Sequence, residues 1–287
     1  MSNRKSKKFT RRRRTRSRKK MINMKGGQES KTFYFYNRMH YGDNILNLKF
    51  FYVNTKLLKE KRIQIHYYYD SVYIKDIKEL ERYVDPAVVH LHPLSEKPES
   101  AIELWMDKII NNITSSNMDK YYNEFYKQIL SYLGLADLQI DTSLYQKEDY
   151  LLDIYEKLDP KFKDIDVFLF NNEPTSGQFD FDKTTFDALA KRLLSKKLKV
   201  VVLKPVGDIP STNTDGLLLQ DVGAISTHAK YILGTNTGAL TPCFNSYTKK
   251  FVKKWIIFCK YGTKFDYIET IILTNPEDVN TADRYIR

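Results

Sequence analysis

Short apolar runs alternate with helical patterns in this sequence, and the alternation occurs twice. In the first half, residues 32–36, 62–69, 88–91 and 102–106 have the β-branched and aromatic composition of strands. In the second half, the expected strands are 165–170, 199–203, 231–233, 255–258 and 268–273. Alternation of this kind predicts parallel sheets with helices packed on them.

Apolar residues recur at helical spacing between these runs. The expected helices are 45–57, 77–83, 119–133, 181–194, 221–229, 239–250 and 276–286. We therefore predict an α/β fold with two Rossmann-like lobes, an N-terminal lobe over residues 28–155 and a C-terminal lobe over 156–287. In doubly wound folds ligands bind at the carboxyl ends of the strands, so the cleft between the lobes is the expected site.

The positive charge of the chain is concentrated at its N-terminus. The net charge is +12, but residues 1–25 hold 13 Lys or Arg and no acidic residue, and the remaining 34 basic residues nearly balance 35 acidic ones. A segment this dense in like charge buries nothing, so we expect residues 1–27 to be a disordered tail. The tail could bind nucleic acid or an anionic surface, or direct nuclear import, and the alternative is a solubilising tail without a dedicated partner.

The remaining composition indicates an intracellular protein. The apolar runs are too short to cross a bilayer, and no apolar segment follows the basic N-terminus as it would in a signal peptide. The two cysteines, Cys243 and Cys259, suit a reducing compartment better than a disulfide framework. We expect no transmembrane segment and a location in the cytoplasm or nucleus.

Three polar loops, 37–44, 171–178 and 234–238, each follow an expected strand. Because the carboxyl ends of parallel strands meet at one edge of a sheet, the loops can face one cleft. Their candidate site residues are Asp43, Thr175, Ser176, Gly177, Gln178, Asn236, Thr237 and Gly238. A glycine-rich turn that leads into a helix presents backbone N–H groups to an anion such as a phosphate. The alternative is that these are ordinary tight turns.

Two of these loops carry a resemblance to a known family. Gly42-Asp43-Asn44 precedes a long helix, and the turn from Gly234 to Gly238 follows a strand. In both features the chain resembles GT-B-fold glycosyltransferases, closest in layout to the heptosyltransferase-like family. It departs from that family where Asn236 stands in place of an acid, and where His228 precedes the turn instead of a histidine following it. The basic tail also resembles those of proteins from large DNA viruses.

The resemblance implies roles for these residues. Asp43 would be the general base, and the amides of Thr237 and Gly238 would hold the diphosphate of a nucleotide-sugar donor. Asn236 stands in the same turn. His228 and the polar turn 175–178 are further candidates for contact with the donor, proposed from their own places in the sequence. The residues themselves leave alternatives open, since Asp43 can cap a helix and a lone histidine is often structural. Asp180 and Asp182 match an Asp-x-Asp metal pattern, but Asp182 is better explained as a helix cap, and we expect no metal and no cofactor beyond the donor.

The expected function is metal-independent transfer of a sugar from a nucleotide-diphosphate donor to an unknown acceptor. A second hypothesis is a catalytically inactive relative, a binding or virion-associated protein tethered to nucleic acid by its tail. A third is another nucleotide-sugar enzyme on the same fold, such as an epimerase.

Overall fold

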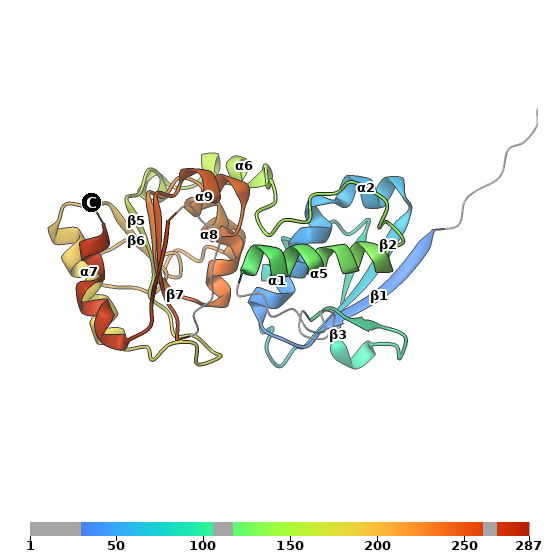
Figure 1. Cartoon of the computed structure of the whole chain (residues 1–287), viewed down its shortest axis with the longest axis horizontal. Helices are drawn as coiled ribbons and strands as arrows, with labels where there is room; N and C mark the ends of the chain where they lie inside the picture. Colours follow the sequence, from blue (N-terminus) through green and yellow to red (C-terminus); the bar gives the residue numbers. More distant parts are fainter. Residues whose placement is uncertain (1–29, 106–116, 261–268, 287) are drawn as a thin grey trace, which may run out of the picture.

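The computed structural model describes residues 30–105, 117–260 and 269–286, which form two lobes side by side (Figure 1). The N-terminal sheet has the order β3-β2-β1-β4, and the C-terminal sheet has the order β6-β5-β7-β8-β9. All the strand pairs within these two sheets are parallel. The strands are β1 (Lys31–Asn37), β2 (Ile63–Tyr69), β3 (Val89–Pro93), β4 (Ile102–Glu103), β5 (Val167–Phe170), β6 (Val200–Val202), β7 (Tyr231–Thr235), β8 (Lys254–Phe258) and β9 (Thr270–Leu273). The predicted α/β architecture with two lobes is confirmed.

The helices between the strands also follow the predicted order. The α-helices are α1 (Tyr41–Val53), α2 (Thr55–Glu60), α3 (Lys78–Glu81), α5 (Met118–Tyr132), α6 (Tyr150–Lys157), α7 (Lys183–Ser195), α8 (Leu219–Ser226) and α9 (Ser246–Phe251). The 3₁₀ helices are η1 (Leu94–Glu96), η2 (Pro160–Phe162), η3 (Gly238–Cys243) and η4 (Pro276–Tyr285). No helix among the described residues is long and apolar enough to span a membrane. The predicted disordered tail lies outside the described residues.

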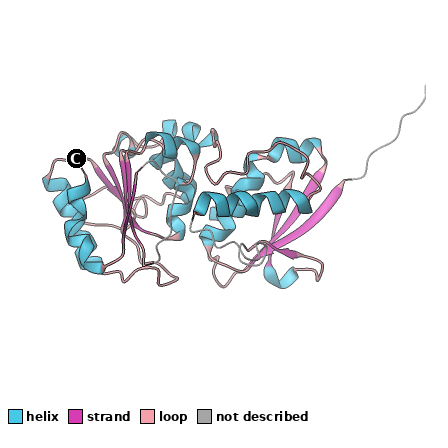
Figure 2. Cartoon of the chain, viewed as in Figure 1, coloured by secondary structure: helices cyan, strands magenta, loops and turns pink. Residues whose placement is uncertain are grey.

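The C-terminal sheet is covered by helices on both faces (Figure 2). Because side chains alternate along a strand, Val167 and Leu169 of β5 pack toward α7 and η4, whereas Phe168 and Phe170 pack on the opposite face. Figure 1 shows α8 and α9 on this second face, beside the N-terminal lobe. The apolar cluster there continues without a break into the N-terminal lobe, where it includes Phe35. The two lobes therefore share one core at their junction.

The prediction of a single helix over residues 239–250 is wrong in detail. The segment instead forms the 3₁₀ helix η3, and α9 begins only at Ser246. Pro242 lies inside η3 and lacks the N–H that an α-helix would need. Asn245 then caps α9, since its Oδ1 accepts a hydrogen bond from the N–H of Thr248.

Two further boundaries differ from expectation. The cap of α5 is Asn117, whose side chain accepts a hydrogen bond from the N–H of Lys120. Asp119, the expected cap, accepts instead from the N–H of Leu144. The lobe boundary predicted near residue 155 falls inside α6, which packs against α8 of the C-terminal lobe. The division of the chain at that residue stays a prediction.

A buried lysine connects the two lobes. Lys49 on α1 is fully buried, and its Nζ donates to Glu148 Oε1 at 2.7 Å and to the carbonyl oxygen of Phe244 at 2.5 Å. The hydroxyl of Tyr150 donates to the second oxygen of Glu148. Since α1 belongs to the N-terminal lobe and Phe244 to the C-terminal lobe, Lys49 fixes one against the other.

Candidate functional site

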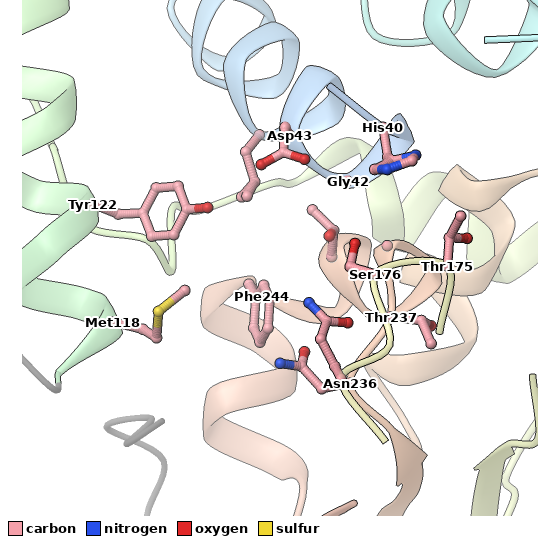
Figure 3. A pocket seen from close by; sticks show the side chains of 14 residues that line it. His40, Gly42, Asp43, Met118, Tyr122, Thr175, Ser176, Asn236, Thr237 and Phe244 are labelled. Atoms are coloured by element: carbon pink, nitrogen blue, oxygen red, sulfur yellow. The ribbon is translucent and has the colours of Figure 1, made fainter. Parts of the chain in front are cut away.

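A cavity of about 190 Å³ lies between the lobes, at the carboxyl ends of β1, β5 and β7. Its lining combines a carboxylate, several hydroxyl and amide groups, and an apolar wall (Figure 3). The lining residues are His40, Gly42, Asp43, Leu46, Met118, Tyr122, Thr175, Ser176, Gln178, Asn236, Thr237, Gly238, Thr241 and Phe244. We call this the Asp43 pocket. The three polar loops predicted to converge do meet here.

Asp43 lies in the first turn of α1, where the partial positive charge of the helix N-terminus favours a carboxylate. It is the third residue of the helix, and His40 occupies the cap position. Asp43 is therefore not the N-cap residue of α1. Figure 3 shows its carboxylate projecting from the end of α1 into the pocket, on the side where Tyr122 lies.

A buried polar network fixes the start of α1. The Asn44 side chain donates to the carbonyl oxygens of Met39 and His40 at 2.9 and 3.0 Å. Its Oδ1 accepts from the hydroxyl of Tyr67, which in turn accepts from Asn47 Nδ2, both at 3.0 Å. Burial raises the pKa of Tyr67 far above its usual value, so the phenol stays protonated. The network holds the segment before Asp43 in one conformation.

The turn after β7 is fixed by the neighbouring strands. The Thr235 hydroxyl donates to the carbonyl oxygen of Asn172 at 2.7 Å, and the Thr237 hydroxyl donates to Asn172 Oδ1 at 3.3 Å. The N–H of Asn236 donates to the carbonyl oxygen of Phe258 at 3.1 Å. Gly238 then begins η3, so the first N–H groups of that short helix lack acceptors within it.

Two glycines let the lobes touch beside the pocket. A Cβ atom on Gly42 would lie 2.9 Å from both Gly238 Cα and Thr241 Oγ1. A Cβ atom on Gly238 would lie 3.0 Å from the backbone nitrogen of Gly42. Both positions therefore need glycine because the backbones of α1 and η3 approach closely. Gly234 has a different role: it lies inside β7 with φ of +148°, where a Cβ would lie 2.4 Å from the Phe170 carbonyl oxygen.

Seven of the nine predicted site residues line the pocket, and Gly177 and His228 do not. His228 precedes β7, so it lies at the amino edge of the sheet, opposite the pocket. Its ring stacks on Tyr155 with centroids 3.8 Å apart, and its Nδ1 lies 2.7 Å from the Thr227 hydroxyl oxygen. Burial lowers its pKa. The expectation that His228 contacts the donor is therefore not supported by its position, and the structural alternative fits.

Several lining residues were missed by sequence reasoning. The apolar wall consists of Leu46, Met118, Tyr122 and Phe244, which come from three separate segments. Nothing in the local sequence marks them, because they meet only through packing of α5 and η3 against α1. Asn44 and Asn47 do not line the pocket but support the start of α1, and they were detectable because two amides interrupt an otherwise apolar helical pattern.

No group of three or more His, Cys, Asp or Glu side chains among the described residues is placed to hold a metal ion. The Asp-x-Asp pair is engaged in other contacts. Asp182 caps α7 by accepting from the N–H groups of Thr184 and Thr185, as predicted, and Asp180 pairs with Lys260 at 2.6 Å. Cys243 and Cys259 are both buried, and burial raises the pKa of Cys243 to about 12.

Comparison with known proteins gives a match in structure but not in sequence. No protein-family model and no curated protein sequence matches the chain. The chain is similar to the structure of E. coli heptosyltransferase WaaC with ADP-2-deoxy-2-fluoro heptose, with a TM-score of 0.54 and 9% identity over 89% of this chain and 98% of that one. The structure of the same enzyme with ADP gives a TM-score of 0.53 and 9% identity over 89% and 96%.

The chain has a GT-B-like glycosyltransferase fold. At this level of identity the likeness concerns the fold alone, and it agrees with the layout expected from the two loop motifs. The Asp43 pocket lies between the two lobes of that fold, with Asp43 on the N-terminal side and the turn at Thr237 on the C-terminal side. None of these comparisons bears on the viral origin suggested by the basic tail, which stays a prediction.

Proposed function

We infer that this protein transfers a sugar from a nucleotide-diphosphate donor to a hydroxyl group of an acceptor. One observation carries the proposal: a carboxylate from the N-terminal lobe and a hydroxyl-rich turn from the C-terminal lobe share one interlobe pocket. Sugar transfer needs both groups, since a base must take a proton from the acceptor and donors must stabilise the departing diphosphate.

In the proposed reaction Asp43 accepts the proton of the acceptor hydroxyl. The acceptor oxygen forms a bond to the anomeric carbon of the donor sugar, on the face opposite the leaving group. The bond from that carbon to the diphosphate oxygen breaks, and its electron pair leaves with the nucleoside diphosphate. The anomeric configuration is inverted, and no metal ion takes part.

The C-terminal turns are proposed to hold the diphosphate. Thr175 and Ser176 are exposed at the pocket and offer hydroxyl groups, while Thr237 and Gly238 offer backbone N–H groups. Gln178 and Asn236 add amide donors to the same wall. The structures of WaaC with ADP and with a fluorinated ADP-heptose support a nucleoside diphosphate as the leaving group.

The basic tail and the location of the protein are separate proposals. Residues 1–25 are dense in arginine and lysine and should bind nucleic acid or another anionic surface. The near-neutral remainder of the chain would then carry the transferase. We propose an intracellular location, and two buried cysteine thiols support a reducing compartment better than a disulfide framework would.

The test is release of nucleoside diphosphate from nucleotide sugars, with and without acceptor extracts. Asp43→Asn should lower turnover by about 10²- to 10⁴-fold, the usual contribution of a general base, while the donor Kd stays the same. Asp153→Asn is the matched control, because Asp153 is an exposed carboxylate on α6. Turnover that survives Asp43→Asn would refute the role of Asp43, and turnover abolished by a metal chelator would refute metal independence.

A second candidate function is nucleotide-sugar binding without catalysis. None of the residues that line the Asp43 pocket in the described part of the chain is Lys or Arg, so no cationic side chain there faces a diphosphate. Asn236 also replaces the acid expected from the family resemblance. Donor binding without turnover for any acceptor would favour this candidate, which could be tethered to nucleic acid or a virion by its tail.

A further inference from the structure

A second cavity of about 530 Å³ adjoins the Asp43 pocket. The two share His40, Thr175, Thr237 and Gly238. In Figure 3 the shared residues His40, Thr175 and Thr237 lie together, on the side away from Tyr122 and Met118. A ligand in the second cavity can therefore reach the Asp43 pocket across this rim. We call it the Tyr73 cavity.

Aromatic side chains form one wall of the Tyr73 cavity. The ring of Tyr73 meets His40 edge to face, with centroids 4.4 Å apart, and Tyr41 lies beside them. The Tyr41 hydroxyl accepts from the N–H of Asp76 at 2.7 Å, which ties the loop that carries Tyr73 to α1. Tyr73 and Val72 remain 44% and 63% exposed, so an apolar surface is open to a ligand. Such a wall suits the flat apolar face of a sugar ring.

Carboxyl groups also contribute to the lining. Asp76, Glu79 and Glu173 contribute to the cavity, and none of its described lining residues is Lys or Arg. Glu79 already accepts a hydrogen bond from the N–H of Leu219 at 2.8 Å, and burial raises its pKa. Asp76 and Glu173 are exposed and can accept hydrogen bonds from hydroxyl or ammonium groups.

We propose that the Tyr73 cavity binds the acceptor, and that the acceptor is an uncharged or aminated carbohydrate. Aromatic rings take the apolar face of the sugar, and carboxylates accept from its hydroxyl or amino groups. An acceptor that carries phosphate or carboxylate groups is excluded there, because the exposed carboxylates of Asp76 and Glu173 repel it and none of the described lining residues is Lys or Arg. The proposal rests on the proposed function, since it assigns the second substrate of the same site.

The charge of the cavity separates the acceptor from the donor. The carboxylates of the Tyr73 cavity would repel the negative charge of a nucleoside diphosphate. The Asp43 pocket instead offers it hydroxyl and amide groups as hydrogen-bond donors. The Tyr73 cavity also draws nearly half of its lining from the N-terminal lobe, including His40, Tyr41 and Tyr73. The two sites therefore meet at the rim, where Thr175, Thr237 and Gly238 line both cavities.

The experiment is NMR titration of the full chain with three tetrasaccharides, built from glucosamine, N-acetylglucosamine or galacturonic acid. We expect affinity to fall in that order, with no binding of the galacturonic acid chain. Tyr73→Ala should weaken binding of the first two by about two- to tenfold through loss of ring stacking. Glu173→Gln should lower the preference for the aminated chain about two- to fivefold. The control is Tyr34→Ala, because Tyr34 is a partly exposed tyrosine on β1 outside both cavities. It should change neither the affinities nor the preference for the aminated chain.

Nucleotide binding measured on the same variants separates this proposal from the proposed function. Carbohydrate binding that depends on Tyr73, without any nucleotide binding, would sustain the cavity assignment and refute sugar transfer. If Tyr73→Ala weakens nucleotide binding and not sugar binding, the cavity holds the nucleoside and the proposal is wrong. Equal binding of the galacturonic acid chain, or no binding of any of the three, would also overturn it.

Discussion

Replacing Lys49 by methionine tests whether the lobes are held together as the structure indicates. The Lys49 ammonium and the Glu148 carboxylate are 0% and 1% exposed and lie 2.7 Å apart. At an effective dielectric constant of about 20, their Coulomb attraction is about 6 kcal/mol. Removing each ion from water costs several kcal/mol, so the net contribution of the intact pair is small.

In the single variant Lys49→Met, the desolvation cost is no longer offset by the Coulomb attraction. Lys49→Met leaves Glu148 buried without its cation, and it leaves the Phe244 carbonyl without its donor. Breaking a buried pair in this way costs about 3 to 5 kcal/mol. In Lys49→Met/Glu148→Gln the uncompensated charge is gone and an acceptor for the Tyr150 hydroxyl remains. The double variant should therefore be more stable than the single one, although it carries more substitutions.

Thermal unfolding is the assay. For a chain of this size each kcal/mol lowers Tm by about 2 to 4 °C, so a cost of about 3 to 5 kcal/mol in Lys49→Met should lower Tm by roughly 6 to 20 °C. Lys147→Met is the control: Lys147 pairs with Asp149, but their side chains are 70% and 65% exposed, so no measurable change is expected. A single variant as stable as the control, or a double variant less stable than the single one, would refute the reasoning.

Three further changes test other parts of the account. Gly42→Ala would force a Cβ into Gly238, so it should cost about 1 to 3 kcal/mol by thermal unfolding and weaken nucleotide binding; unchanged binding would contradict the close interlobe contact. Tyr67→Phe leaves Asn44 without its hydroxyl partner and should cost about 1 to 3 kcal/mol, and a neutral result would show that the network does not support α1. Burial and the neighbouring His92 and His90 lower the pKa of His66 from 6.5, so the unfolded chain binds the proton more readily and stability falls as the pH drops through that value. Denaturant unfolding at pH about 7.5 and about 5.5 should show a smaller loss for His66→Gln than for the unmodified chain, and an equal loss would exclude this contribution.

Much of the fold was accessible from sequence because its local signals agree with its tertiary structure. The runs that became β5 and β6 are continuous and apolar, as parallel strands buried on both faces must be. Asp182 was identified as a cap from its place before a helical pattern. The helix expected after Ala239 failed because Pro242 and the Asn245 cap outweighed its apolar spacing.

The site was predictable where it depends on loops that follow strands. Asp43, Thr175 and Thr237 lie where the parallel topology puts them, at the carboxyl edges of the two sheets. His228 was misplaced because nearness in sequence to the turn does not determine the sheet edge. Lys49 was out of reach for another reason: a fully buried lysine is rare, and only the fold brings Glu148 and Phe244 to it.

The central claim is that the Asp43 pocket binds a nucleotide-diphosphate sugar, and a thermal-shift screen tests it most directly. The chain would be screened against UDP, GDP, ADP, CMP and their sugars. At a hundred times Kd, binding adds about 2.7 kcal/mol, or roughly 5 to 11 °C in Tm. The account predicts a shift with at least one nucleotide, kept in Asp43→Asn and in the exposed control Thr184→Val, and reduced in Thr175→Val/Ser176→Ala. No shift with any nucleotide, or a shift that the double variant leaves unchanged, would contradict it.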